Sequence, residues 1–291
     1  MFKFNNKNFL DLLNYTKKFF FQKLGNKNSI TLENKYKKYY ISKILNNKLI
    51  VIDIDKNKKI FFPFQKMGLK TTADLFGYYE HLIFLLYYLK SNEYKKRAAD
   101  IGSNLGLHSI ILSIFGYKVD SFEPDPDHYK FQKKILKLNK ASNVRVFNKG
   151  VYDENCKKNL YKVLDNPYAN FVQGEKKGYG KLKKIKIKLI DIKKIIYKYD
   201  LVKIDAEGSE AKIITSLKKK DHLKTDFIVE VSGRENAQKI LNHCNKFRIN
   251  VFSHKNSWKK VHNLNKMPLH HSEGLIVITK DKSYFNFLRA N

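Results

Sequence analysis

The 291-residue sequence has only two cysteines, Cys156 and Cys244, too few for a disulfide framework or a four-cysteine metal site. We expect both to be reduced thiols in a cytoplasmic protein. No apolar run reaches the ~18 residues that a membrane span needs. The first residues also lack a signal-peptide pattern, because Asp11 and Asn14 interrupt the apolar stretch and no small-residue cleavage site follows.

Acidic residues are scarce as well, with 27 Asp and Glu against 58 Lys and Arg and a net charge of +31. Such a balance is typical of proteins that bind nucleic acid or anionic membranes. Here the lysines are spread along the whole chain and arginine is scarce, whereas nucleic-acid recognition favours arginine. We therefore interpret the charge as compositional drift. The hydrophobic fraction of 43% allows a sizeable core and excludes wholesale disorder.

Residues 1–72 are expected to form an N-terminal extension of helix and short strands. An approximate helical stripe of apolar residues comprises Phe9, Leu10, Leu13, Phe20 and Leu24. This stripe could dock on its own domain, which we favour, or lie on an anionic membrane through residues 1–30. Two short strands are predicted over Leu49–Asp53 and Lys59–Phe64.

Residues 73–291 alternate strand and helix, a pattern typical of a parallel sheet with crossover helices. The predicted helices are Tyr78–Leu89, Leu105–Phe115, Pro126–Asn139, Ser209–Leu217 and Glu235–Asn245, and the predicted strands are Arg97–Ile101, Lys118–Glu123, Val144–Asn148, Leu201–Asp205, Phe227–Val231, Asn250–Ser253 and Gly274–Thr279. No helix separates the last two strands, which indicates an antiparallel pair at that point. Lys157–Leu164 and Lys184–Leu189 indicate an inserted hairpin. The fold class is therefore α/β, with a mostly parallel seven-stranded Rossmann-like sheet and helices on both faces.

The sharpest motif is Asp100-Ile-Gly-Ser-Asn-Leu-Gly106, at a predicted turn from a buried strand into a helix. Gly102 permits a tight turn and close approach of a ligand, and Gly106 lets the helix pack on the strand. Glu123 follows at the tip of the second strand. An acid at that tip can accept hydrogen bonds from both ribose hydroxyls of a nucleoside cofactor.

Two cofactors suit an acid at this position, a nicotinamide dinucleotide and S-adenosylmethionine. The dinucleotide motif requires glycine where this chain has Asn104 and Leu107. We also expect Asp100 to face the turn, where it would repel a pyrophosphate by about 4 kcal/mol at ~4 Å and favour the ammonium of S-adenosylmethionine. S-adenosylmethionine is therefore the predicted cofactor. Its candidate ligands are Asp100, Gly102, Ser103, Asn104, Gly106, Glu123 and Asp205.

The sequence resembles the FkbM family of S-adenosylmethionine-dependent methyltransferases. The resemblance covers about residues 95–232 and is carried by Asp100-Ile-Gly-Ser-Asn-Leu-Gly-Leu-His-Ser109, Phe122-Glu-Pro-Asp-Pro126, Val202-Lys-Ile-Asp-Ala-Glu-Gly-Ser-Glu210 and Ile228-Val-Glu230. It implies the Rossmann-like class I methyltransferase fold and O-methylation of natural products or sugars. It also implies that Asp100, Gly102, Asn104 and Gly106 surround the methionine part of the cofactor, with Glu123 on the ribose.

Catalytic candidates are expected at the carboxyl ends of the parallel strands, where ligands bind in such sheets. Asp205 ends the fourth strand, Glu207 and Glu210 follow it, and Glu230 lies near the end of the fifth. These acids could orient the acceptor or take its proton, hold a divalent metal, or stabilise a helix N-terminus. No metal site is predicted, because no further ligand has clear spacing. Lys203 is expected to pair with one of these acids.

The loop over residues 254–273 is expected to lie above the cofactor edge of the sheet. His271 is the catalytic candidate from this loop, and Trp258 could form a platform for a sugar ring. His108 is expected to pack against the sheet or the cofactor pocket.

The leading hypothesis is an S-adenosylmethionine-dependent O-methyltransferase acting on a hydroxyl of a sugar, glycan or related small molecule. The alternatives are a nucleic-acid methyltransferase, which is disfavoured because an Asn-Pro-Pro-aromatic motif is missing, and a non-catalytic basic module that binds membranes or polyanions.

Overall fold

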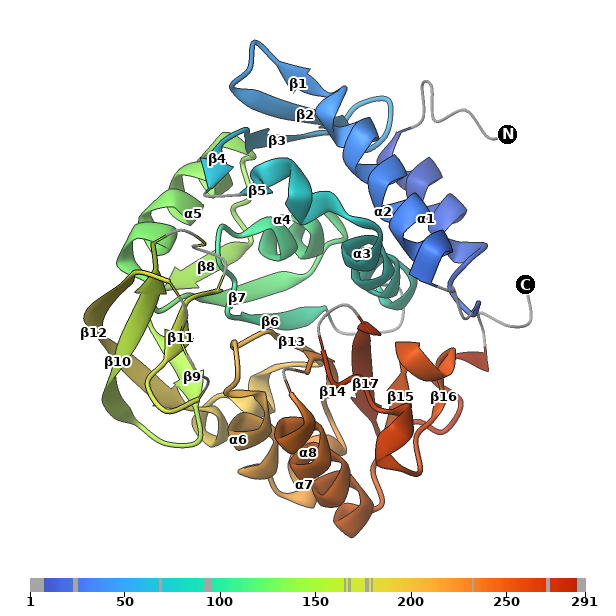
Figure 1. Ribbon diagram of the computed structural model, residues 1–291, viewed down its shortest axis with the longest axis vertical. Coiled ribbons are helices and arrows are strands. Elements are labelled where there is room, and N and C mark those ends of the chain that lie inside the picture. The colour runs from blue at the N-terminus through green and yellow to red at the C-terminus, as the bar shows by residue number, and fades with distance from the viewer. Residues whose placement is uncertain are drawn as a thin grey trace.

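The computed structural model describes residues 8–286 apart from 23–25, 68–69, 92–95, 165, 167–168, 176–177, 179, 232 and 271–272. Its centre is an eight-stranded sheet in the order β16-β15-β17-β14-β13-β6-β7-β8 (Figure 1). The strands are β6 (Arg97–Ile101), β7 (Lys118–Phe122), β8 (Val144–Phe147), β13 (Leu201–Ile204), β14 (Asp226–Glu230), β15 (Asn250–Ser253), β16 (Lys259–Lys260) and β17 (Leu275–Thr279). The predicted α/β fold with a mostly parallel sheet is confirmed, and the eighth strand is the two-residue β16 at one edge.

The strand order places a topological switch between β6 and β13. Strands β7 and β8 follow β6 on one side, and β13 and β14 follow it on the other. All five strands are parallel. β17 inserts antiparallel between β14 and β15, as the missing last helix predicted. Crevices beside such a switch point are where ligands bind in open α/β sheets.

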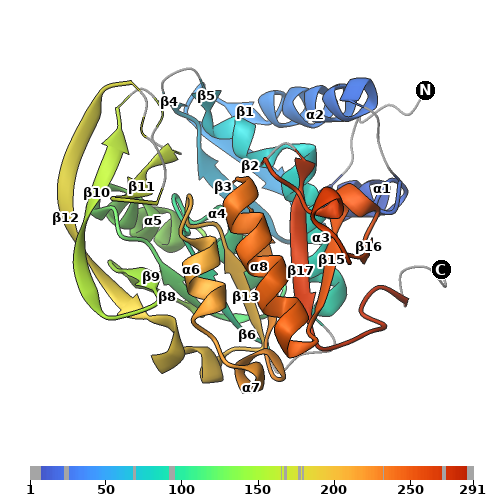
Figure 2. The ribbon, with the colours of Figure 1, turned by 60° about the horizontal axis from the view of Figure 1, so that its bottom comes forward.

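Helices cover both faces of this sheet, as predicted, and each face has its own hydrophobic cluster (Figure 2). On one face lie α3 (Tyr78–Lys90), α4 (Leu107–Ile114) and α5 (Pro126–Leu138), and on the other lie α6 (Glu210–Thr215), the short α7 (Lys219–His222) and α8 (Arg234–Phe247). The strands carry runs of buried apolar residues rather than an alternating pattern, because both of their faces are covered.

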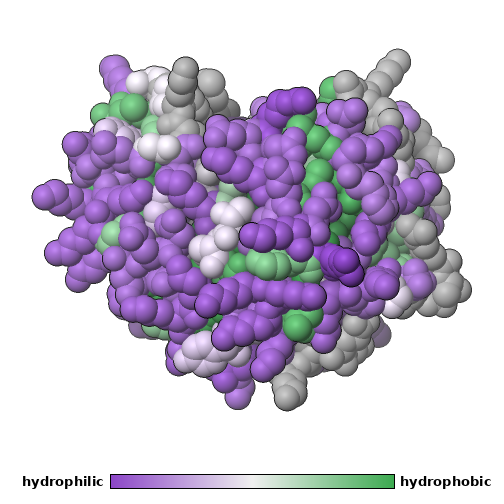
Figure 3. Space-filling model, turned by 90° about the horizontal axis from the view of Figure 1, so that it is seen from below, coloured by the Kyte–Doolittle hydropathy of each residue, from purple (hydrophilic) through white to green (hydrophobic). Residues whose placement is uncertain are grey.

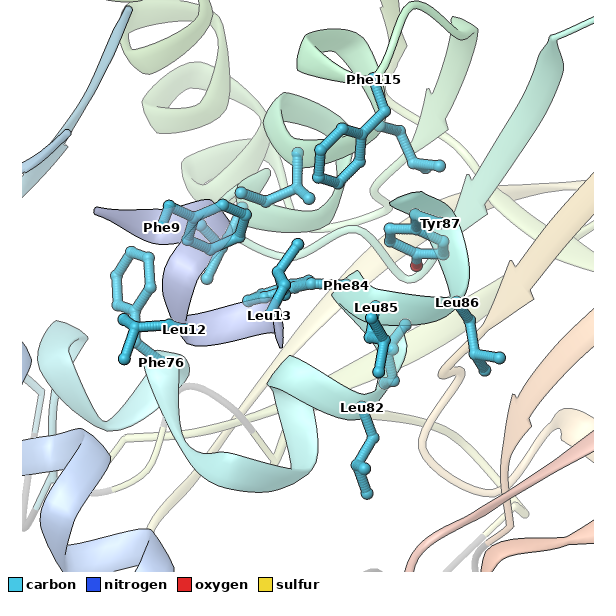
Figure 4. Close-up of a cluster of buried hydrophobic side chains, with 14 of the residues drawn as sticks. Phe9, Leu12, Leu13, Phe76, Leu82, Phe84, Leu85, Leu86, Tyr87 and Phe115 are labelled. Carbon is cyan, nitrogen blue, oxygen red and sulfur yellow. The ribbon is translucent and has the colours of Figure 1, made fainter. Parts of the chain in front are cut away.

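The N-terminal extension packs on the α3 face and shares its core. It contains α1 (Phe9–Lys17), α2 (Asn26–Ile41), β1 (Ile44–Leu45), β2 (Leu49–Asp53), β3 (Lys59–Pro63), β4 (Lys66–Met67), β5 (Lys70–Thr71) and the 3-10 helix η1 (Thr72–Phe76). Figure 4 shows Phe9, Leu12 and Leu13 of α1 beside Phe84 of α3. The apolar stripe therefore docks on its own protein, as we favoured; Leu24 lies outside the described residues. The boundary at residue 72 stays a prediction.

The predicted hairpin insertion is a four-stranded sheet in the order β11-β10-β12-β9. Its strands are β9 (Gly150–Tyr152), β10 (Cys156–Val163), β11 (Phe171–Val172) and β12 (Leu182–Asp191). β10 and β12 pair antiparallel over eight residues each. Figures 1 and 2 both place this insertion at the end of the molecule away from β15 and β16.

The loop over residues 254–273 starts at the carboxyl end of β15, the expected edge of the sheet, and Leu269 accepts the Gly233 N–H just after β14. It folds back along the sheet edge through η5 (His254–Asn256), β16, which pairs with β15, and η6 (Leu264–Lys266). Trp258 is fully buried and stacks on Phe20 with ring centroids 4.8 Å apart, so the expectation of a sugar platform is wrong. Phe20 of the N-terminal extension covers Trp258, and the sequence of the loop by itself does not reveal this partner.

Hydrophilic side chains cover most of the face seen in Figure 3. Within the described residues, no helix combines the length and the apolar character that crossing a bilayer requires.

The Phe20–Trp258 contact gives a test of how the extension is held. We expect Phe20→Ala to lower the free energy of unfolding by about 3–5 kcal/mol, because it opens a cavity beneath a buried indole. Tyr197→Ala is a matched control, since that ring is 71% exposed and its loss is expected to cost no more than about 0.5 kcal/mol. Urea unfolding measures both; equal losses would contradict the docking of the extension on the C-terminal loop.

Candidate active site

A cavity lies at the carboxyl edge of the sheet, beside the switch between β6 and β13. It is lined by Ile101, Gly102, Asn104, Glu123, Pro124, His128, Gly150, Val151, Leu160, Asn170, Val172, Leu189, Asp205, Ala206, Glu207 and Ser209. One wall consists of the turns after β6, β7 and β13, and the opposite wall comes from the insertion. Four of the seven predicted cofactor residues, Gly102, Asn104, Glu123 and Asp205, are therefore brought together around one space.

The turn after β6 is fixed by Gly102, whose backbone has φ +73°. Its N–H donates to the Phe122 carbonyl at 3.0 Å, which ties the tips of β6 and β7 together. A Cβ at this position would overlap the carbonyl oxygen of Asp205. Glycine is therefore required twice, for the left-handed conformation and for the close approach of the two strand ends.

Glu123 follows β7 and directs its carboxyl group into the cavity edge. Its Oε2 accepts the Asn104 N–H at 2.8 Å and its Oε1 accepts the Asp125 N–H at 2.7 Å. Burial raises the pKa of Glu123 to about 8, against the lowering effect of these two hydrogen bonds. Each carboxylate oxygen has a second lone pair, so this group can still accept a bond from a diol in the cavity.

Asn104 and an apolar wall form further parts of the cavity lining. Asn104 is held at φ +50°, and its Oδ1 is buried without a hydrogen-bond partner. A buried polar atom without a partner in the protein is an acceptor waiting for a ligand or water. Across the cavity, Leu160, Val172 and Leu189 of the insertion present an apolar surface suited to a flat base.

Three predicted cofactor residues lie behind this cavity. Ser103 is buried and donates to Gln132 at 3.1 Å, and Gly106 starts α4 with φ +87° against the same side chain. Asp100 is fully buried; its Oδ2 accepts the Ser109 hydroxyl at 2.7 Å and its Oδ1 lies 4.0 Å from Lys203 Nζ. Asp100 does not line this cavity, but its Oδ1 is buried without a hydrogen-bond partner and Lys203 only partly offsets its charge, so its contact with the cofactor stays a prediction.

Lys203 pairs with one of the acids predicted to act on the acceptor, as expected. Lys203 Nζ lies 3.2 Å from Asp205 Oδ2, and although burial opposes its charge, Asp205 and Asp100 raise its pKa above the usual range. Glu207 lines the main cavity and has φ +48°. Glu230 lies in a small pocket beside the main cavity. Burial and the nearby Asp205 raise the pKa of Glu230 well above its ordinary value.

That small pocket opens between α3 and the ends of β14 and β17. It is lined by Tyr79, Glu80, Ile83, Glu230, Gly274 and Leu275. Glu80 is fixed by His108, whose Nε2 lies 2.9 Å from Glu80 Oε2, and Tyr87 OH lies 3.1 Å from the other ring nitrogen. His108 thus packs beside the site, as predicted, and holds one of its acids.

Glu210 has a structural position. Its carboxylate accepts the N–H groups of Ala206 at 3.0 Å and Gly208 at 2.9 Å, and it closes the turn that carries Glu207. Burial raises the pKa of Glu210 to about 8. Of the loop candidates, His271 lies outside the described residues, and no described residue of 254–273 lines the main cavity.

Sequence reasoning missed how the insertion is attached to the site. Glu175 is bound by Lys212 of α6 at 2.9 Å and by the hydroxyl of Tyr152, which also contacts Lys158 at 2.8 Å. The only signal in the sequence was the acidic Glu175 within the glycine-rich loop. Its partners Lys158 and Lys212 lie too far along the chain to be identified from spacing. This network holds the loop against the turn at Gly208.

No family model and no curated protein matches the chain. Similar solved structures include precorrin-6y C5,15-methyltransferase from Geobacter metallireducens GS-15, 13% identical over 69% of this chain and 89% of that one, with a TM-score of 0.40. The SAM-dependent methyltransferase from Agrobacterium tumefaciens is 8% identical over 70% and 60%, with a TM-score of 0.38. A methyltransferase from Geobacter sulfurreducens is 14% identical over 67% and 75%, with a TM-score of 0.36.

The buried carboxyl of Glu123 predicts a pH-dependent stability. Its pKa is about 8 in the folded protein and 4.5 for an ordinary glutamate, so folding retains a proton that the unfolded chain has lost. Its contribution to stability therefore falls as the pH rises from 4.5 to about 8. We expect the ligand-free wild type to lose stability relative to Glu123→Gln across this range. Urea unfolding of both proteins measures the difference, and a difference independent of pH would contradict the burial of this charge.

Proposed function

We propose that the chain is an S-adenosylmethionine-dependent methyltransferase. The observation that carries this proposal is the Glu123 carboxyl at the tip of β7, facing the same cavity as the Gly102 turn. The orphaned Asn104 Oδ1 and the apolar wall fit a nucleoside with a free diol and a flat base. In this arrangement Glu123 would hold the ribose, and Leu160, Val172 and Leu189 would contact the base.

The sheet itself favours this cofactor over a dinucleotide. A doubly wound dinucleotide-binding sheet has the order 3-2-1-4-5-6 with parallel strands in both halves. Here β17 runs antiparallel between β14 and β15, so the second half lacks the parallel repeat. In addition, Asn104 and Leu107 occupy positions where the pyrophosphate motif requires glycine. We therefore prefer S-adenosylmethionine because of the antiparallel β17 and the residues at positions 104 and 107, and not because of the charge of Asp100.

The acceptor reacts, in this proposal, between the main cavity and the small pocket of Glu80 and Glu230. When bound, S-adenosylmethionine supplies an electrophilic methyl group. Asp205 orients the acceptor hydroxyl and takes its proton, while Lys203 fixes the Asp205 carboxylate at 3.2 Å. Glu230, with its raised pKa, retains a proton and donates a hydrogen bond to the acceptor.

A hydroxyl of a sugar, glycan or related small molecule is the acceptor that we propose. Carboxylates suit hydroxyl donors, and Glu80, Glu207 and Asp205 surround the space where the acceptor would sit. Among the described residues that line either pocket there is no lysine or arginine, which speaks against a nucleic-acid substrate. We also propose that the chain belongs to the FkbM family. The support is its Lys-Ile-Asp-x-Glu-Gly-x-Glu stretch at residues 203–210, of which Asp205 and Glu207 line the main cavity.

Calorimetry with S-adenosylmethionine and S-adenosylhomocysteine tests the proposal. We expect both to bind, and Glu123→Ala to bind roughly 10- to 100-fold more weakly, because hydrogen bonds to a charged group are lost. Binding to the wild type should tighten as the pH rises toward about 8, because the diol requires the ionised carboxylate.

Glu235→Ala is the matched control, since its side chain is 82% exposed and contacts only Lys239 in the described structure. It should bind both nucleosides like the wild type. Failure of the folded wild type to bind either nucleoside, or equal affinity in Glu123→Ala, would overturn the proposed function.

A further inference from the structure

The β10–β12 ribbon has two faces with different partners. Its inner face lines the cavity through Leu160 and Leu189. The lysines of β10 on this face are neutralised, because Lys158 lies near Glu175 and Lys162 contacts Asp125 at 2.9 Å. Both of these β10 lysines therefore have acidic partners, whereas Lys183 of β12, opposite Lys162, is exposed.

The outer face carries lysines without such partners. Lys184, Lys186 and Lys188 alternate along β12, so they share a face about 6.8 Å apart, and all three are exposed. Lys157 of β10 lies directly opposite Lys188. None of these four lysines forms an ion pair with an acidic residue in the described part of the chain. Like charges directly opposite one another destabilise a sheet, and an anionic partner bound to this face would remove the repulsion between Lys157 and Lys188.

The same ribbon ends in exposed leucines. Leu182 belongs to the outer row of β12 and is 42% exposed, and Leu164, which follows β10, is 52% exposed. The two segments meet there, because the Leu164 N–H donates to the Lys181 carbonyl at 3.0 Å. An extended nucleic acid would need only the lysines, whereas leucines beside a lysine row match the apolar and anionic layers of a lipid surface.

We propose that the outer face of the β10–β12 ribbon docks on an anionic lipid membrane. Leu164 and Leu182 enter the interfacial layer, and Lys157, Lys184, Lys186 and Lys188 contact the headgroups. The inner face of the same strands walls the candidate cofactor cavity, so docking brings that cavity within about one sheet spacing, ~10 Å, of the membrane. This inference goes beyond the proposed function and does not rest on it.

Co-sedimentation of the full chain with vesicles tests the proposal. We expect binding to phosphatidylcholine vesicles that contain phosphatidylglycerol, little binding to pure phosphatidylcholine, and weakening with salt. The variant Lys184→Gln/Lys186→Gln/Lys188→Gln should bind on the order of 100-fold more weakly, at about fivefold per lysine. Leu164→Ser/Leu182→Ser should lose at least about tenfold with its charge unchanged.

The matched control is Lys133→Gln/Lys134→Gln/Lys137→Gln, which removes the same charge from exposed positions on α5. It should bind like the wild type, and circular dichroism should show all variants folded. Equal loss in both lysine variants would mean diffuse attraction by a +31 chain and would overturn the proposal.

Three other outcomes would also overturn it. The first is absence of vesicle binding by the folded wild type. The second is self-association of the β12 variant with unchanged vesicle binding, which would mean that the lysines only protect a strand edge. The third is binding to a single-stranded RNA oligonucleotide that depends on the β12 lysines, without vesicle binding. S-adenosylmethionine calorimetry on the same samples keeps these outcomes separate from the proposed function.

Discussion

The close approach of two backbone turns is the constraint on which the rest of the site depends. The turn after β6 meets the Asp205 carbonyl so closely that residue 102 has no room for a side chain. The same turn is tied to the end of β7 by the Gly102 N–H. Strand ends that belong to three separate parts of the sequence are therefore held in one fixed arrangement. Glu123 and Asp205 line one cavity as a consequence of this arrangement, and not of any contact between them.

The polarity of the site is opposite to that of the chain. A protein with net charge +31 places Glu80, Glu230 and Asp205 around a single buried lysine at its candidate reaction centre. Lys203 neutralises part of this negative charge inside the sheet. Burial raises the pKa of Glu230, which favours its uncharged form. The lysines that dominate the composition lie elsewhere, so overall charge is a poor guide to what this cavity recognises.

The sequence predicted most of the sheet, because buried parallel strands and glycine turns are local signals. The seven predicted strands of the central sheet match β6, β7, β8, β13, β14, β15 and β17 to within a residue at each end. It failed where a distant segment decides the outcome. Trp258 was assigned to a ligand, but Phe20 of the extension covers it. Asp100 was expected to face the cofactor, but it does not line the main cavity, and the lysine two residues before Asp205 lies beside it inside the sheet. Neither partner can be found from spacing along the chain.

The contact between Phe20, Trp258 and Phe285 has a consequence for synthesis of the protein. Phe20 emerges from the ribosome long before its two partners, and it remains exposed until Trp258 and Phe285 have been made. Contacts between residues so distant in sequence close late, because the intervening chain must first be ordered. Phe285 therefore completes the burial of Phe20, and a chain that stops before this residue would leave an aromatic surface open to aggregation.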